Sequence, residues 1–220
     1  MKFLKEADFN VVSLGNLIKN FRENKIQTAK TIALTFDDGF QNFYAEAFPV
    51  LAECGFTATV FLVTNYCEKY NDWEGNLPTL ERSKLLSWNE IKELHKYGIE
   101  FGAHSLTHPD FTKIPLEQVR RELVESKLVI EDKLGSAVKT FAYPYGRFNT
   151  AVKQLTAQHY AAACSTNLGK VKESSDFYSL KRVDTYYLKD ERMFRSLESV
   201  SFDYYLQFRQ VMRNLKRLFV

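Results

Sequence analysis

The chain has 220 residues, of which 45% are hydrophobic and 15% aromatic, and this is enough to bury one substantial core. Its formal net charge is only +3, which gives no electrostatic case for a nucleic-acid partner. Its three cysteines, Cys54, Cys67 and Cys164, form no CxxC pair and are odd in number, which argues against a disulfide framework and favours buried thiols.

Short β-rich runs alternate along the chain with longer runs of helical spacing. Strands are expected at residues 31–36, 57–63 and 99–103, around Phe141, from Tyr160 onward and at 178–183. Helices are expected between them at residues 14–24, 43–54, 88–97, 115–134 and 149–158. This alternation predicts parallel strands joined by right-handed crossovers. We expect an α/β fold, a distorted, incomplete (β/α) barrel with six or seven parallel strands, as a single domain over residues 1–220.

Two polar strings directly follow two of these strands. Thr35-Phe36-Asp37-Asp38-Gly39 ends the first, and His104-Ser105-Leu106-Thr107-His108-Pro109 follows the strand at 99–103. In barrels of alternating strands and helices, active sites are built at the carboxyl ends of the strands. One carboxylate and two imidazoles are suitable ligands for a divalent metal, and the second carboxylate is left to handle a proton beside metal-bound water. Together the strings predict a metal-dependent hydrolase.

Each string alone has a simpler explanation. Asp-Asp-Gly is a common turn, and a HxxxH pair is more often part of a helix surface or a core contact. Their joint occurrence on the same predicted face, each directly after a strand, favours the metal site.

The two strings resemble the first and second motifs of polysaccharide deacetylases of the NodB-homology type, carbohydrate esterase family 4, and the resemblance covers about residues 30–185. It implies that Asp37 is the general base and that Asp38, His104 and His108 hold a divalent ion. Zinc is expected, although Asp-His-His sites also accept cobalt or nickel. The implied reaction is hydrolytic removal of N-acetyl groups from an N-acetylated glycan, with N-acetylglucosamine units as the expected substrate.

Phe141-Ala142-Tyr143-Pro144-Tyr145-Gly146 resembles the third motif of the family, Arg-x-Pro-Tyr. The resemblance implies that the backbone N–H of Tyr145 helps to bind the oxyanion of a tetrahedral intermediate. It also implies that Tyr143 and Pro144 contact the substrate. The alternative is a turn with no chemical role.

The chain departs from this motif at Ala142, where many members carry an arginine that orients the base. Arg182, in the strand at 178–183, is the best candidate to reach Asp37 from another strand end. Alternatively, Arg182 lies on the surface or pairs with a structural acid such as Asp184.

The general acid is not specified by the sequence. The family uses a histidine, but His95 and His159, the two histidines outside the ligand pair, are expected on a solvated helix face and at a helix end. Residues 1–14 resemble the middle of a helix and a following strand in a subgroup whose preceding strand carries a Tyr-His pair. We hypothesise that this chain lacks that first strand and, with it, the usual acid.

Aromatic side chains in the insertion at residues 65–87 are candidates for sugar stacking, Trp73 in particular; alternatively, they only pack the loop down. Two rival functions remain open. One is hydrolysis of a non-sugar cyclic imide or ureide by the same fold and metal. The other is a non-catalytic barrel that binds metal and glycan.

Residues 202–220 predict a basic amphipathic helix that packs on its own barrel or on a partner. Peripheral membrane contact is an alternative, with the basic residues of this segment facing anionic headgroups; these are Arg209, Arg213, Lys216 and Arg217. The sequence contains no signal peptide or transmembrane run, so cytoplasmic and cell-surface locations both stay open, and it does not indicate an oligomeric state.

Overall fold

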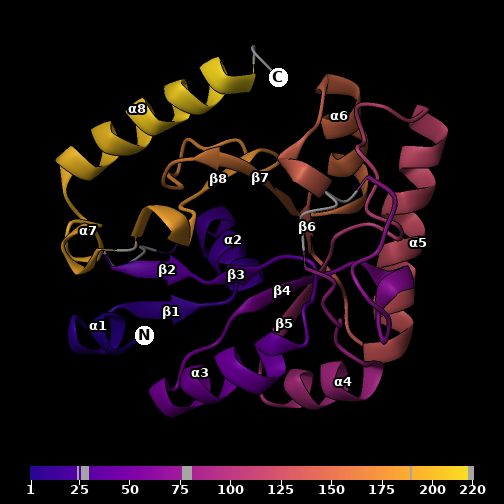
Figure 1. Cartoon of the computed structure of the whole chain (residues 1–220), viewed down its shortest axis with the longest axis horizontal. Coiled ribbons are helices and arrows are strands. Elements are labelled where there is room, and N and C mark those ends of the chain that lie inside the picture. Colours follow the sequence, from indigo (N-terminus) through magenta and orange to yellow (C-terminus); the bar gives the residue numbers. More distant parts are fainter. Residues whose placement is uncertain (24, 26–29, 76–80, 189, 218–220) are drawn as a thin grey trace.

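A computed structural model describes residues 1–23, 25, 30–75, 81–188 and 190–217. Six strands form one parallel sheet in which each strand lies beside its neighbour in the chain. They are β3 (Thr35–Phe36), β4 (Thr59–Leu62), β5 (Glu100–Ala103), β6 (Thr140–Ala142), β7 (Ala162–Leu168) and β8 (Leu180–Arg182). The sheet is curled and surrounded by helices (Figure 1), which confirms the expected incomplete (β/α) barrel.

Four of the α-helices lie around the outside of the curl (Figure 1). They are α3 (Phe48–Cys54), α4 (Trp88–Lys96), α5 (Leu116–Leu134) and α6 (Thr150–His159). The chain also forms single helical turns at Thr64–Tyr66, Pro144–Gly146 and Thr185–Leu188. The main core, which includes Val60, Phe101 and Phe141, lies between the sheet and these helices.

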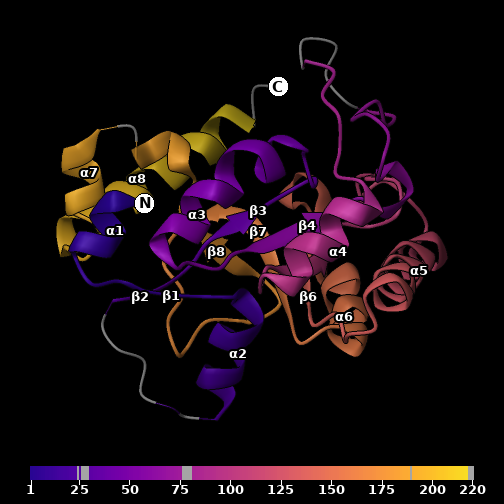
Figure 2. The ribbon, with the colours of Figure 1, turned by 90° about the horizontal axis from the view of Figure 1, so that it is seen from below.

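The helix α2 (Leu14–Arg22) is placed differently, because it fills one end of the curl. Its apolar face, with Leu17 and Ile18, forms a second core with inward-facing residues of the sheet such as Phe61 and Ala142. Figure 2 shows α2 projecting from one end of the molecule.

The start of α2 is tied to the amino ends of two strands. The Gly15 N–H donates to the Glu100 carboxylate at 3.0 Å, and the Leu14 N–H donates to the Thr59 hydroxyl at 2.9 Å. Glu100 and Thr59 are the first residues of β5 and β4. The amino end of the barrel is therefore closed by α2.

Two expected elements are divided in the structure. The strand expected at 31–36 is split into β2 (Thr31–Ala33), which pairs with β1 (Asn10–Val12), and β3, which pairs with β4. The helix expected at 43–54 begins as a π-helical segment (Phe43–Ala47), and α3 follows it with proline in its first turn. The Phe48 N–H bonds to the Phe43 carbonyl, one residue further back than in an α-helix. Pro49 has no N–H to continue the ladder, so the division falls there.

The chain ends are helical as expected. The helix α1 (Lys2–Glu6) precedes β1, and the helices α7 (Glu191–Arg195) and α8 (Val200–Arg217) follow the last strand. The expected end of the first long helix at residue 24, residues 76–80 of the insertion and residues 218–220 of the tail lie outside the described part of the chain.

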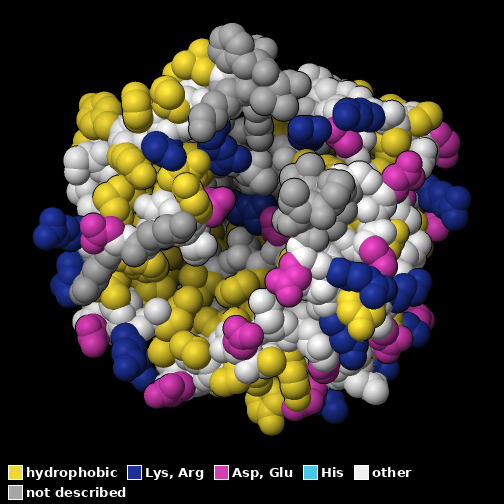
Figure 3. All heavy atoms as spheres, in the orientation of Figure 1, with side chains coloured by type: hydrophobic (Ala, Val, Ile, Leu, Met, Phe, Trp, Pro, Cys, Tyr) yellow, Lys and Arg dark blue, Asp and Glu magenta, His cyan; other side chains and the backbone are white. Residues whose placement is uncertain are grey.

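The tail helix α8 turns two of its arginines toward the barrel. Arg213 donates to the Thr166 carbonyl at 2.9 Å, and the Arg209 guanidinium lies 4.9 Å from the centre of the Tyr187 ring. Arg209 and Arg213 are therefore directed toward other parts of the chain, and the alternative of peripheral membrane contact through this helix stays a prediction. Hydrophobic side chains gather on the outer face over α8 (Figure 3); the exposed ones are Val200, Tyr204, Phe208, Val211, Met212 and Leu215. Among the described helices, none has the length and apolarity needed to cross a membrane.

Candidate active site

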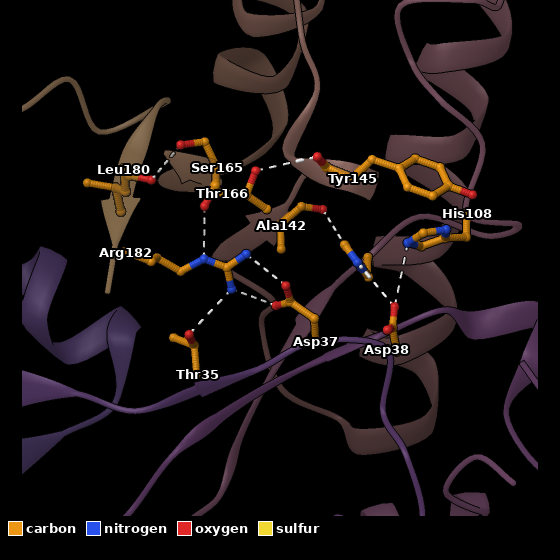
Figure 4. A network of polar contacts seen from close by, with 11 residues as sticks. Thr35, Asp37, Asp38, His108, Ala142, Tyr145, Ser165, Thr166, Leu180 and Arg182 are labelled. Atoms are coloured by element: carbon orange, nitrogen blue, oxygen red, sulfur yellow. Dashed lines mark hydrogen bonds and ion pairs between the residues drawn. The ribbon is translucent and has the colours of Figure 1, made fainter. Parts of the chain in front are cut away.

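The two polar strings meet at the carboxyl ends of β3 and β5, as the sequence predicts. Asp38 follows β3, and His104 follows β5 directly. Asp38 Oδ1 lies 3.4 Å from His104 Nε2 and 3.5 Å from His108 Nε2 (Figure 4). The three ligand atoms lie within 4.8 Å of one another, a spacing that a single metal ion can bridge.

The hydrogen bond of the His104 ring and the lowered pKa of His108 both suit metal binding. His104 Nδ1 lies 2.7 Å from the Ala142 carbonyl, so Nδ1 carries the proton and donates, and Nε2 faces Asp38. Burial and the neighbouring His104 lower the pKa of His108 to about 3, which keeps that ring neutral. Asp38 Oδ1 is buried and has no hydrogen-bond partner. The metal-ligating atoms of Asp38, His104 and His108 thus face one common point, and a divalent cation fits there.

Four residues with side chains around this point have left-handed backbone conformations. Asp38, Ser105, His108 and Tyr145 have φ values of 68°, 71°, 60° and 57°. Non-glycine residues adopt this region rarely, and such strain gathers where a surrounding structure enforces it, often at functional sites. Two of these residues, Asp38 and His108, belong to the ligand set, so their left-handed backbone conformations help to set the direction of the ligand side chains.

Arg182 binds the second carboxylate of the first string. Its guanidinium donates to both oxygens of Asp37, at 2.6 Å and 2.7 Å (Figure 4). It also donates to the Ser165 carbonyl at 2.9 Å and lies 3.4 Å from the Thr35 hydroxyl. Arg182 therefore reaches Asp37 from β8, which is one of the two interpretations of the sequence. The other, in which Arg182 lies on the surface or pairs only with Asp184, is wrong.

This ion pair fixes the charge of Asp37. Burial by itself would raise the pKa of the carboxyl, but the adjacent guanidinium outweighs burial and lowers the pKa to about 2. Asp37 is thus ionised throughout the neutral range. Its two oxygens are held in a fixed plane by the bidentate contact.

The third motif packs around His108. The Tyr145 ring lies 4.6 Å from the His108 ring, and the phenol oxygen is buried. The side chains of Tyr143 and Pro144 are buried as well, and the Tyr143 hydroxyl donates to the Tyr178 carbonyl at 3.0 Å. In this arrangement Tyr143 and Pro144 support the turn that carries Tyr145, and the substrate contact expected of them stays a prediction.

Trp73 also lies against the ligand set and not on the surface. It is only 4% exposed, and its ring lies 4.7 Å from that of His108 and 5.4 Å from that of Tyr66. A buried indole offers no face to a sugar ring, so the stacking role expected for Trp73 does not fit this arrangement. The alternative, that the aromatics hold the loop down, agrees with the contacts.

The structure brings neither spare histidine to the site. His95 Nδ1 lies 3.4 Å from the Ile99 carbonyl just before β5, and His159 ends α6 just before β7. Both lie near the amino ends of strands, whereas the ligands lie at the carboxyl ends. Of the histidines in the described chain, only His104 and His108 belong to the site.

Sequence reasoning missed several residues that hold the site in place. Thr35 and Ser165 contact Arg182, and Glu122 of α5 accepts hydrogen bonds from the loop between the two histidines. A signal for Glu122 was present, because it lies beside Val119 and Leu123 on the core-facing side of its helix. A charged residue among buried apolar positions usually has a specific partner.

Comparison with known proteins identifies the family of the chain. Residues 24–163 match the family model described as polysaccharide deacetylase. The chain is 25% identical over 158 residues to the poly-beta-1,6-N-acetyl-D-glucosamine N-deacetylase of Staphylococcus aureus, a match that covers 68% of this chain and 51% of the relative. It spans 61% of a second curated relative, from Bacillus subtilis.

Solved structures show the same fold. The deacetylase PplD of Streptococcus pyogenes, solved in complex with acetate, aligns with a TM-score of 0.72 and 26% identity over 82% of this chain and 75% of that chain. A polysaccharide deacetylase from Bacillus cereus aligns with a TM-score of 0.68 and 28% identity over 83% of this chain and 54% of that chain. The family model covers more than half of the sequence. The chain belongs to the polysaccharide deacetylase family.

Proposed function

We propose that this chain removes N-acetyl groups from an N-acetylated amino-sugar polymer or oligosaccharide of the N-acetylglucosamine type. The observation that supports the proposal is that two neighbouring carboxylates at the site have different partners. Asp38 faces two histidines, and Asp37 beside it is held by Arg182. The substrate class is supported by the relative in Staphylococcus aureus, whose name states deacetylation of poly-beta-1,6-N-acetyl-D-glucosamine.

Carbohydrate esterases of family 4 are metal-dependent, and the donor set here is Asp38, His104 and His108. We propose zinc as the metal, with cobalt or nickel as alternatives that accept the same ligands. When bound, the ion supplies Lewis-acid chemistry, making water acidic enough to act as a nucleophile near neutral pH and polarising the amide carbonyl.

The residues around the ligand set have separate roles in this proposal. Asp37 is the base that accepts a proton from the attacking water, and Arg182 fixes the plane of its carboxylate. The backbone N–H of Tyr145 stabilises the oxyanion, and the left-handed turn at Tyr145 sets the direction of that peptide. Trp73 and the Tyr145 ring flank His108 and limit its movement. The products are acetate and a free amino sugar.

The proposal is tested by acetate release from a panel of N-acetylated glycans, in which β-1,6-linked and β-1,4-linked N-acetylglucosamine oligomers are compared. Each glycan is incubated with protein loaded with zinc, cobalt or nickel, and Asp37→Asn loaded with the same metal is the matched control. We expect acetate release by the wild type and a loss of about 10²–10⁴-fold in the variant. Release at the wild-type rate by Asp37→Asn would contradict the assignment of the base.

One observation favours a second candidate, a non-catalytic barrel that binds metal and glycan. No histidine of the described chain other than the two ligands lies at the carboxyl ends of the strands, so the usual acid is not at the site. Metal uptake without acetate release from any glycan in the panel would support this candidate. A cyclic imide substrate in the same panel tests the remaining alternative, hydrolysis of a non-sugar amide.

A further inference from the structure

The loop between the two histidine ligands is bound by a buried glutamate of α5. Glu122 of α5 is 5% exposed, and its carboxylate accepts three hydrogen bonds from residues 106 and 107. Oε2 accepts the Leu106 N–H at 2.8 Å and the Thr107 N–H at 3.0 Å, and Oε1 accepts the Thr107 hydroxyl at 2.7 Å. These two residues are the middle of the segment that joins His104 to His108.

A carboxyl group in this place needs an explanation, because a polar group is costly to bury without hydrogen-bond partners. Its neighbours on the core-facing side of α5 include Val119 and Leu123, both fully buried. The three donors described above are neutral: two backbone N–H groups and one hydroxyl. All three donors lie within 3.0 Å of the carboxyl oxygens, so they supply the hydrogen bonds that a buried acceptor requires. The carboxylate therefore binds the loop firmly.

The loop itself requires such a restraint. Ser105 and His108 both have left-handed backbone conformations, which are unfavourable for non-glycine residues. The Ser105 hydroxyl oxygen accepts the His108 N–H at 2.9 Å, which closes the turn on one side. Glu122 holds the other side. Without it, Leu106 and Thr107 would each keep a backbone N–H without its acceptor, and the strained turn could relax.

We propose that Glu122 is a positioning residue for the metal centre, which holds the segment 105–108 in the conformation that aims both His104 and His108 at Asp38. It touches no ligand atom and acts only through the loop. The inference rests on the metal site of the proposed function but on no particular substrate. It predicts that loss of the three hydrogen bonds weakens metal binding more than it weakens the fold.

The test compares variants on one helix. Glu122→Ala removes all three hydrogen bonds, whereas Glu122→Gln can keep them, because its carbonyl oxygen can accept both N–H groups and its amide can donate to the Thr107 hydroxyl. Ser126→Ala is the matched control: Ser126 is equally buried on α5, but its hydroxyl donates to the Glu122 and Leu123 carbonyls within the helix. Thr107→Val removes one of the three bonds from the loop side and covers the case in which Glu122→Ala does not fold.

Two readouts are measured, and neither needs turnover. Zinc affinity is measured by competition with a chromophoric chelator, and hydrogen exchange of the Leu106 and Thr107 amides is measured by NMR in the metal-free protein. We expect a loss of affinity of about 10–100-fold in Glu122→Ala, the range found when groups that orient metal ligands are removed. A smaller loss is expected in Thr107→Val, and near-wild-type values in Glu122→Gln and Ser126→Ala. Both amides should exchange faster in Glu122→Ala.

Several outcomes would overturn the inference. Wild-type affinity in a folded Glu122→Ala protein would do so, and so would an equal loss in Glu122→Gln, because the negative charge and not the hydrogen bonds would then be responsible. Unchanged amide exchange in Glu122→Ala would also overturn it. If the wild type takes up no zinc, the proposed metal site fails, while the exchange rates still decide whether Glu122 holds the loop.

Discussion

Arg182 and Asp37 join the first and last strands of the curled sheet. The strands β3 and β8 stand at opposite ends of the strand order and are not paired with each other, yet the guanidinium on β8 contacts both carboxylate oxygens just after β3, at 2.6 Å and 2.7 Å. The side chain of Arg182 is 19% exposed and that of Asp37 30% exposed. One ion pair therefore both bridges the gap in the barrel and fixes the carboxylate assigned as the base.

Replacing Arg182 should move the acid side of the pH–activity profile upward. Burial raises the pKa of Asp37 and Arg182 lowers it, so removal of the guanidinium leaves burial unopposed and the pKa rises from about 2. In Arg182→Gln we expect kcat/KM to begin falling at a higher pH than in the wild type as the pH is lowered. Arg182→Lys keeps the charge and should shift less. If kcat/KM falls at the same pH in Arg182→Gln and in the wild type, Arg182 does not lower the pKa of Asp37.

Substitution of the two neighbouring aspartates should affect different properties, kcat for Asp37 and metal content for Asp38. Asp37→Asn removes the proposed base but no ligand, so metal content should stay at the wild-type level while kcat falls by about 10²–10⁴-fold. Asp38→Asn weakens the ligand set, so metal content itself should fall. Metal analysis beside acetate release separates the two, and metal loss in Asp37→Asn alone would exchange their roles.

Metal binding should stabilise the folded protein. A ligand at about 100 times its Kd adds about 2.7 kcal/mol to the free energy of unfolding, provided that it binds the folded state only. For a chain of this size that corresponds to a rise in Tm on the order of 5–10 °C. Thermal unfolding with and without zinc measures it, and His104→Ala should show a much smaller rise. An equal rise in that variant would mean that the ion binds elsewhere.

Trp73 should matter for stability and metal affinity and not for sugar stacking. Its ring is 4% exposed and packs on His108, and truncation of a buried tryptophan to alanine costs about 3–5 kcal/mol. In Trp73→Ala we expect a lower Tm and weaker zinc binding, with Trp73→Phe less affected. The KM of the metal-saturated enzyme for glycan should change little. A large rise in KM with unchanged Tm and zinc affinity would restore the stacking role.

Acid should weaken the fold partly through Asp37. Its pKa is about 2 in the folded protein against an ordinary value of 3.8. A carboxyl whose pKa is depressed by folding contributes stability that is fully present above about pH 4 and is lost as the pH falls through 2. Chemical denaturation at pH 4.5 and pH 2.5 should show a larger decrease for the wild type than for Asp37→Asn. Equal decreases would show that Arg182 does not favour the ionised form in the native state.

The parts of this site that depend on local sequence could be predicted, and those that depend on distant contacts could not. The meeting of the two strings could be predicted because each directly follows a strand, and parallel strands bring their carboxyl ends together. That Asp38 and not Asp37 joins the two histidines was implied by the family resemblance. Arg182 was one of two interpretations, since its partner is 145 residues away in the chain and depends on how far the sheet curls. The curl is a property of the whole barrel and not of any local pattern.

Burial was harder to predict than position. Trp73 and Tyr143 are aromatic residues near the site, and nothing in their own segments shows that neighbouring loops cover them. The division of residues 31–36 into two strands also follows from tertiary pairing, because β2 and β3 join different sheets. Glu122 could have been found from its position on an apolar helix face, but its partner loop could not.

The helix α2 determines how a glycan could reach this centre. It seals the amino end of the curl through the contacts of Gly15 and Leu14 with the first residues of two strands, whereas the ligand set stands at the opposite end. The space-filling view is hollowed near its centre (Figure 3). With its amino end closed by α2, the described part of the barrel has no continuous path from one end to the ligand set at the other. Under the proposed function, a polymer would lie across the carboxyl end of the strands and would not thread through the barrel, and acetate would leave on the side from which the sugar approached.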